Sequence, residues 1–287
     1  MASYLDQYSM PALCQALCVG RSGFYAWRKR EHGAKAIDVA VSNVYIAQRC
    51  KVGAPSVAAG VAANGFKVSE STVGRSMKRQ GLRARMSRKF RHTTDSKHSY
   101  KVSPNLLDRQ FKVAMPNQVW VGDITYLRVR EGWLYLAVMI DLFSRQVVGW
   151  QMSDRINQEL VNDALDAALT TRGKPNGVMI HSDQGVQYCA KSFRKIIADN
   201  HLTQSMSRKA NCWDNAVAES FFASLKKQSI YGYALKTRDA MRSHIFEYIE
   251  IYYNRVRRHS TNGWLSPVDF ERLHHKTIEE QAVHLND

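Results

Sequence analysis

The stretch Met179-Ile180-His181-Ser182-Asp183-Gln184-Gly185-Val186-Gln187-Tyr188 decides how the second half of this chain is organised. Its apolar beginning predicts a short buried strand, which ends at Asp183, where a glycine two residues later permits a turn. Thirty-five residues separate Asp183 from Glu219, which lies in a run with helical spacing. A third carboxylate, Asp123, follows the apolar run Val119-Trp120-Val121. We therefore expect two strand-end aspartates and one helix glutamate to converge on one point.

Three converging carboxylates are typical of divalent-metal phosphoryl transfer. Mg²⁺ prefers hard oxygen ligands and keeps several waters, so a few carboxylates and phosphate oxygens can hold it. Two Mg²⁺ (or Mn²⁺) ions can activate the attacking oxygen and stabilise the leaving one. In this interpretation Asp123 bridges both ions, while Asp183 holds one and Glu219 the other. The nucleophile would be water or a DNA 3′-hydroxyl, since the chain shows no convincing Ser/His/Asp or Cys/His set.

Charge is segregated along the 287 residues, which carry a formal net charge of +16. Residues 1–110 hold 19 Lys/Arg against 6 Asp/Glu, whereas residues 111–287 hold 22 against 19. The first part therefore indicates a polyanionic partner, DNA or RNA, and the rest is typical of a globular domain. The apolar content of 45% supports a substantial core.

The five cysteines do not indicate a disulfide framework or a zinc finger, because their number is odd and no CxxC pair occurs. We find nothing that resembles a signal peptide or a membrane span. The expected location is the bacterial cytoplasm, in association with the nucleoid.

Short helices are expected through the N-terminal third of the chain. Residues 10–18 and 23–30 predict either a small helix-turn-helix or a helical hairpin packed on its neighbour. Residues 37–49 predict one further helix. Residues 57–64 and 72–80, joined by a turn, form a stronger helix-turn-helix candidate because basic residues gather on and after its second helix. The expected DNA contacts there are Arg75, Lys78, Arg79, Arg83 and Arg85.

Three strands with short connections are followed by a helix, a strand, a helix, a strand and a helix. The expected strands are 118–129, 133–143, 146–152, 178–182 and 203–207, and the helices are 157–172, 191–200, 215–231 and 237–255. This mixed α/β order predicts a five-stranded ribonuclease-H-like sheet that begins with an antiparallel meander.

Other acidic and basic residues compete for roles at the site. Asp141, Asp154 and Asp214 are the alternatives to the chosen aspartates, and Asp141, late in the second strand, is the strongest of them. Lys226 lies on the helix face of Glu219, either as a DNA contact or as an ordinary solvated lysine. Arg208 and Lys209 are weaker candidates for contacting DNA, and His181 is expected to be a packed, hydrogen-bonded histidine.

The chain resembles the integrase-core subunit of insertion-sequence transposases in the IS-three family. Motifs along nearly the whole chain carry the resemblance, namely residues 53–55, 68–69, 72–73, 81–85, 119–126, 140–145, 181–188, 213–222, 225–226, 253–254, 257, 259–260, 263, 266–267 and 270. It implies a retroviral-integrase-like fold and a DDE active site at Asp123, Asp183 and Glu219 with two Mg²⁺ or Mn²⁺ ions. It also implies cleavage at element ends and strand transfer into DNA by a 3′-hydroxyl.

The resemblance further implies partners. These are double-stranded DNA in the form of terminal inverted repeats and target DNA, other copies of the chain, and a DNA-binding protein from an upstream reading frame, fused by frameshifting. The expected organisation is a helical hairpin (1–35), a helix-turn-helix region (36–92), a linker (93–116), an integrase catalytic core (117–275) and a C-terminal tail (276–287). A non-catalytic DNA-binding regulator and a plain nuclease are the competing hypotheses.

Overall fold

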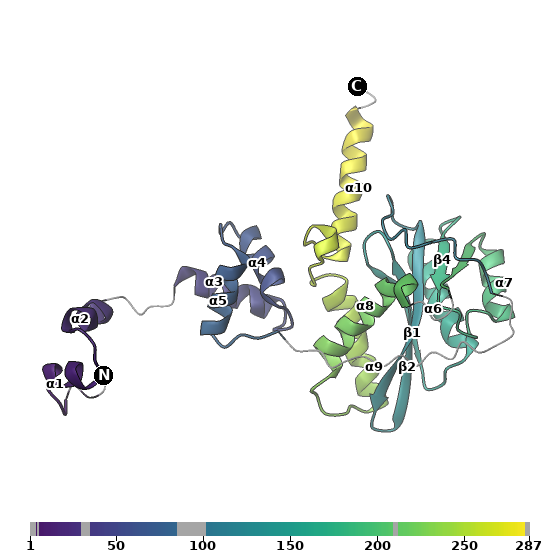
Figure 1. Cartoon of the computed structure of the whole chain (residues 1–287). Helices are drawn as coiled ribbons and strands as arrows, with labels where there is room; N and C mark the ends of the chain where they lie inside the picture. The colour runs from purple at the N-terminus through teal and green to yellow at the C-terminus, as the bar shows by residue number, and fades with distance from the viewer. Residues whose placement is uncertain (1–3, 5, 30–34, 85–101, 209–211, 285–287) are drawn as a thin grey trace.

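A computed structural model describes residues 4, 6–29, 35–84, 102–208 and 212–284. Short helices make up the N-terminal part, and a mixed α/β body follows (Figure 1). The sheet of this body consists of β1 (Val119–Val129), β2 (Gly132–Asp141), β3 (Val147–Ser153), β4 (Met179–Ser182) and β5 (Thr203–Met206). None of the described helices is both long and apolar enough to cross a membrane.

The strand order is β3-β2-β1-β4-β5. Strands β1, β2 and β3 form the expected antiparallel meander, and β4 and β5 add to β1 in parallel. The ribonuclease-H-like sheet expected from the order of elements is therefore confirmed. Parallel pairing requires a crossover, and the helices after β3 and β4 supply the two crossovers.

Helices cover both faces of the sheet because side chains alternate between the faces of each strand (Figure 1). Helices α6 (Gln158–Thr171) and α7 (Lys191–Asp199) bury one face, to which β1 contributes Trp120. Helices α8 (Ala216–Leu225) and α9 (Arg238–Phe246) bury the other, to which β1 contributes its odd-numbered residues such as Val121. Both α8 and α9 continue into a π-helical turn, η3 (Lys226–Ile230) and η4 (Glu247–Tyr253) respectively.

Helix α6 approaches β3 most closely at Gly149. A Cβ atom at this position would lie 2.4 Å from both the Ala164 carbonyl oxygen and the Ala168 backbone nitrogen. The sheet and the helix therefore meet backbone to backbone, which only glycine permits here.

The described N-terminal helices are α1 (Met10–Ala16), α2 (Arg21–Lys29), α3 (Ala36–Ala47), α4 (Ala54–Ala63) and α5 (Glu70–Arg79). Helices α3, α4 and α5 share a small apolar core of their own. The segment after α3 also touches the α/β body, because Gln48 donates to the Val256 carbonyl and Arg49 pairs with Glu247. The Lys51 ammonium lies 4.9 Å from the ring centre of Tyr252.

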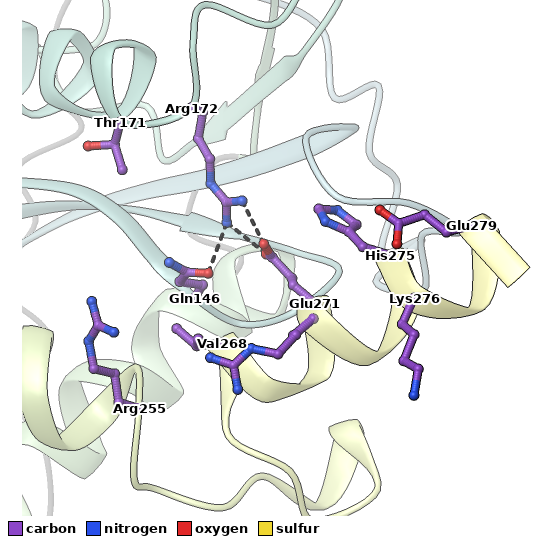
Figure 2. Close-up of a pocket in the computed structure, with 10 residues that line it drawn as sticks. Gln146, Thr171, Arg172, Arg255, Val268, Glu271, His275, Lys276 and Glu279 are labelled. Atoms are coloured by element: carbon purple, nitrogen blue, oxygen red, sulfur yellow. Dashed lines mark hydrogen bonds and ion pairs between the residues drawn. The ribbon is translucent and has the colours of Figure 1, made fainter.

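Helix α10 (Pro267–His284) was not expected from the sequence and crosses the tail boundary placed at residue 275. Its first turns are held to the body by Glu271, which accepts hydrogen bonds from Arg172 at 2.6 and 2.7 Å (Figure 2). Glu271 also accepts a hydrogen bond from Ser144. Arg172 and Glu271 line a cavity of about 520 Å³. Burial lowers the pKa of the Arg172 guanidinium, but the hydrogen bonds and negative charge of Glu271 raise it by more, so the net pKa is raised.

We predict that Glu271→Ala lowers the free energy of unfolding by about 3–5 kcal/mol, because it removes the carboxylate that pairs with the largely buried charge of Arg172. Chemical denaturation of the whole chain measures this change. Asp199→Ala, which removes one partner of the exposed pair Lys195–Asp199, is the matched control and should cost about 0.5 kcal/mol or less. Equal costs for the two variants would contradict a stabilising role for the buried pair.

Candidate active site

Strand register brings Asp123 and Asp183 level with each other. Strands β1 and β4 pair from Val119 with Met179 to Val121 with His181, an offset that places Asp123 opposite Asp183 two residues further on. There β4 has ended, so Asp183 stands in the loop beyond it. Asp123 does not end a strand, contrary to expectation, because β1 continues to pair with β2 as far as Val129. Only Asp183 follows a strand end.

Helix α8 brings Glu219 to the same region. Asp123 has the odd numbering of Val121, and alternation therefore directs its side chain toward the sheet face that α8 covers. Helix α8 packs there through Ala218, Phe221, Phe222 and Leu225, and Glu219 lies in its first turn. Lys226, seven residues later, returns to the same helix face.

Electrostatics confirm that these groups are neighbours. Burial raises the pKa of Asp123 well above its usual value, and repulsion from Asp183 and then Glu219 raises it further. A backbone hydrogen bond from Ile124, 2.8 Å from Asp123 Oδ1, and attraction by Lys226 act in the opposite direction. The Asp183 carboxylate accepts a 2.9 Å bond from the backbone N–H of Gly185. Negative charge is therefore concentrated in a poorly solvated place.

The donor set suits a hard divalent cation, because it consists of carboxylate oxygens whose mutual repulsion such an ion would relieve. Among the described residues, no three or more His, Cys, Asp or Glu side chains are placed to hold one ion together. Within the described part of the chain, two buried polar atoms near these carboxylates have no hydrogen-bond partner, the Oδ1 of Asn215 one helical turn before Glu219 and the hydroxyl of Tyr188. Burial raises the pKa of the Tyr188 phenol, and the negative charges of Asp123 and Asp183 raise it further.

Lys226 is not the ordinary solvated lysine that the sequence left open, because only 9% of its surface is exposed. Burial lowers its pKa to about 8, and attraction by Asp123 opposes this shift. The side chain therefore belongs to the carboxylate site. It lies where α8 gives way to the π-helical turn η3, a kind of irregularity that is frequent at functional sites.

The competing aspartates have structural partners. Asp141, fully buried at the end of β2, accepts hydrogen bonds from the backbone N–H groups of Asn117 and Phe143. Arg208 holds the pKa of Asp214 far below its usual range, with help from Arg109. Asp154 pairs with Arg238 at 3.7 Å.

His181 is packed and hydrogen-bonded, as expected. Its two ring nitrogens lie 2.9 Å from the Ser205 hydroxyl and 3.0 Å from the Asp214 carbonyl oxygen. Burial lowers the pKa of its imidazole, so the neutral ring is favoured. His181 thus supports the β4–β5 edge below Asp183.

Apart from Lys226, the predicted DNA contacts that the structure describes lie on or just after α5 and beside Asp214. Arg75, Lys78 and Arg79 belong to α5, and Arg83 follows it, although Arg79 also pairs with Asp38. The Arg208 guanidinium donates two hydrogen bonds of 2.9 Å to the Asp214 carboxylate. Arg85 and Lys209 lie outside the described residues.

Two tyrosines near the site were missed from the sequence. Tyr188 belongs to the stretch that opened the search, and Tyr126 lies three residues after Asp123. Repulsion from Asp123 and Asp183 contributes to the raised pKa of both phenols. Their position within the carboxylate motifs was the available signal, but aromatic residues in strand motifs usually serve packing alone.

Comparison with known proteins identifies the core and its relatives. Two family models described as "Integrase core domain" match residues 113–212 and 219–274. The transposase InsF for insertion sequence IS3A of Escherichia coli is 44% identical over 272 residues, which are 92% of this chain and 94% of that protein. A 31 kDa protein of insertion element IS600 from Shigella sonnei is 41% identical over 92% of this chain. The intasome structure of simian T-cell lymphotropic virus is 16% identical, with a TM-score of 0.47 over 74% of this chain and 69% of that one.

Proposed function

Because the chain belongs to the IS3 family of insertion-sequence transposases, we propose that Asp123, Asp183 and Glu219 are the catalytic carboxylates of its DNA transposition reaction. The observation that carries this assignment is the strand register that sets Asp123 opposite Asp183, and the pKa of the Asp123 carboxyl is raised by burial, by Asp183 and by Glu219. The reaction is cleavage of DNA at the ends of an insertion sequence, followed by strand transfer in which a 3′-hydroxyl attacks target DNA.

The same three carboxylates would hold two Mg²⁺ or Mn²⁺ ions, with Asp123 shared between them. Bound divalent ions supply Lewis-acid stabilisation of the attacking and leaving oxygens in such a displacement. The chain contributes the burial of Asp123, which lowers the local dielectric and strengthens every charge interaction at the site. Mutual attraction to the ions would draw the three carboxylates closer together than repulsion alone permits.

Lys226 is proposed to hold a DNA phosphate beside the carboxylates. Its ammonium is within electrostatic reach of Asp123, and burial makes a contact there stronger than one at an exposed surface. The basic residues on and after α5, and to a lesser degree Arg208 and Lys209, would contact DNA farther from the reaction.

We propose the division of the chain that its sequence predicts, except that α10 crosses the boundary placed at residue 275. Residues 36–92 would bind the terminal inverted repeats, and residues 117–275 would carry the chemistry on a dimer or larger assembly. An upstream-frame protein fused by frameshifting would add further DNA contacts. We place the working protein at the nucleoid of the bacterial cytoplasm.

Incubation of the whole chain with labelled insertion-sequence ends and a target plasmid tests this function. We expect cleaved ends and joined products in Mg²⁺ or Mn²⁺, and neither in EDTA. Cleavage without joining would indicate a nuclease. DNA binding without either product, in any divalent ion, would contradict the catalytic assignment and favour a regulator.

The pKa of Lys226 predicts how DNA binding depends on pH. Because the lysine loses its proton near a pKa of about 8, wild-type binding to end DNA should weaken several-fold from pH 7 to pH 9, as expected for one lost phosphate contact. Lys226→Arg, which stays charged, should remove most of this pH dependence. Fluorescence anisotropy measures it, and Lys227→Met controls for loss of a neighbouring charge. An unchanged pH profile in Lys226→Met would contradict the assignment.

A further inference from the structure

An aromatic strip, defined here as Tyr126, Trp133 and Tyr135 with Arg128, lies on the β1–β2 hairpin. The rings pack edge to face, with centroids 6.2 Å apart for Tyr126 and Trp133 and 5.2 Å apart for Tyr126 and Tyr135. The Arg128 guanidinium lies 5.1 Å from the centre of the Trp133 ring. Strand register fixes the strip, because Tyr126 is paired with Tyr135 and Arg128 with Trp133.

One face of this hairpin is fully covered and the other only in part, since Tyr126 and Tyr135 are half-buried and Tyr135 packs against the cluster of α6 and α7. Leu127 and Val129 point to the opposite face, where they are buried with α9 and its neighbours. On the strip side, Arg128 is exposed and Trp133 keeps 45% of its surface exposed. Single exposed aromatic side chains are common on this chain, but a group of neighbouring rings with an arginine forms a patch of the kind that marks binding sites.

The hairpin is a rigid support for the strip. Arg130 at its turn donates to the carbonyl oxygens of Lys236 and Leu235 through its backbone nitrogen and its Nε, each at 2.9 Å. The Glu131 carboxylate accepts the backbone N–H of Arg238. A surface fixed in advance loses little conformational entropy when it binds.

The strip begins beside the carboxylates. The pKa of the Tyr126 phenol is raised first by burial and then by Tyr135, and the negative charges of Asp183 and Asp123 raise it further. Strand β4 pairs with β1 only as far as Val121, and the hairpin extends beyond it. Asp123 faces the α8 side of the sheet and the strip faces the other side, so a DNA strand with its scissile phosphate at Asp123 would bring its neighbouring nucleotides to the strip around the edge of β1 beyond Val121.

We propose that the strip is a stacking site for unpaired nucleobases of the DNA end during the reaction. Aromatic faces stack with any base, and Arg128 adds a positive charge suited to the adjoining phosphate. The mixture of exposed rings and arginine favours nucleic acid over a second protein chain, whose docking patch would be expected to be more continuously apolar. This placement of the DNA strand relative to the strip rests on the proposed function of Asp123, Asp183 and Glu219.

The test compares DNA ends that differ only in pairing. Whole-chain binding is measured by anisotropy in EDTA, on one duplex that is fully paired and another whose last bases at one end are unpaired. We expect Trp133→Ala to weaken binding to the unpaired end about tenfold and to the paired end by less than about twofold. Trp133→Phe should restore most of the affinity, and Trp133→Leu, which keeps apolar bulk, should not.

Tyr233→Ala removes a similarly exposed aromatic residue outside the strip and should leave both affinities unchanged. A 2-aminopurine placed among the unpaired bases should be quenched by wild type and by Trp133→Phe, but not by Trp133→Ala. Equal losses on both duplexes, unquenched 2-aminopurine with wild type, or a change of oligomeric state in place of affinity would overturn the proposal. EDTA prevents cleavage, so this outcome is independent of whether the carboxylates catalyse transposition.

Discussion

Asp123→Asn, Asp183→Asn and Glu219→Gln should each lower the rate of metal-dependent end cleavage by about a thousandfold or more. Each removes one anionic oxygen ligand, and the loss of several kcal/mol of transition-state stabilisation corresponds to a rate factor of this size. Single-turnover cleavage of labelled element ends measures the rates. Binding to the same DNA in EDTA should stay within about twofold of wild type, because basic side chains, and not these carboxylates, make the proposed phosphate contacts.

Asp141→Asn is the matched control. Asp141 is a buried aspartate of the same sheet whose carboxylate accepts hydrogen bonds from backbone N–H groups. Cleavage by this variant should remain, at whatever level its folding allows. Full activity in Asp123→Asn, Asp183→Asn or Glu219→Gln would show that the replaced carboxylate is not catalytic.

Asp123→Asn should also stabilise the metal-free fold while it removes activity. The pKa of this carboxyl is raised in the folded chain, so stability is lost as pH rises from the ordinary pKa of an aspartate to the folded value, and the whole loss persists above it. Asparagine cannot ionise. The melting temperature of the Asp123→Asn variant in EDTA at neutral pH should therefore exceed that of the wild-type protein. A lower melting temperature would contradict the placement of Asp123 in a repulsive site.

Gly149→Ala should cost at least about 3 kcal/mol of unfolding free energy, a large part of the stability of an ordinary domain. Its added Cβ would lie 2.4 Å from two backbone atoms of α6 and 2.6 Å from the Cβ of Ala168. Backbone atoms cannot rotate away as a side chain can, so the helix itself must move off β3. Denaturant titration of the purified chain measures the loss.

Gly122→Ala is the control on the neighbouring part of the sheet. There an added Cβ would meet the Met139 sulfur at 3.1 Å and the ring of Tyr188 at 3.4 Å. The flexible end of Met139 can shift by the few tenths of an ångström required, so the cost should be much smaller than at Gly149. Similar costs at the two positions would show that α6 adapts to the added methyl group.

The alternation of apolar residues was sufficient to predict the sheet and the helices that cover it. Five strands and four helices of the α/β body fall close to their expected bounds. Helix α10 was missed because most of its residues beyond residue 271 are exposed and polar, so little apolar periodicity marked it. Its attachment depends on Glu271 and Arg172, which are 99 residues apart, and such a pair leaves no local signal.

The candidate site divides in a similar way. Spacing alone set Glu219 and Lys226 on one helix face, since a helix repeats after seven residues. The sequence and the family resemblance already favoured Asp123 over Asp141, although both follow apolar strand residues, and strand register adds a physical reason for that choice. Asp123 lies opposite Asp183, whereas Asp141 turns back to Asn117.

The sequence by itself determined the order of elements, the helix face of Glu219 and Lys226, and the segregation of basic residues into the first 110 positions, because each depends on local periodicity or composition. Only the tertiary structure decided that Asp123 and Asp183 are level, that Lys226 is buried, and that Tyr126, Trp133 and Tyr135 share one partly open face. The physical reason is that strand register and burial depend on contacts between segments far apart in the chain, and no local pattern encodes them.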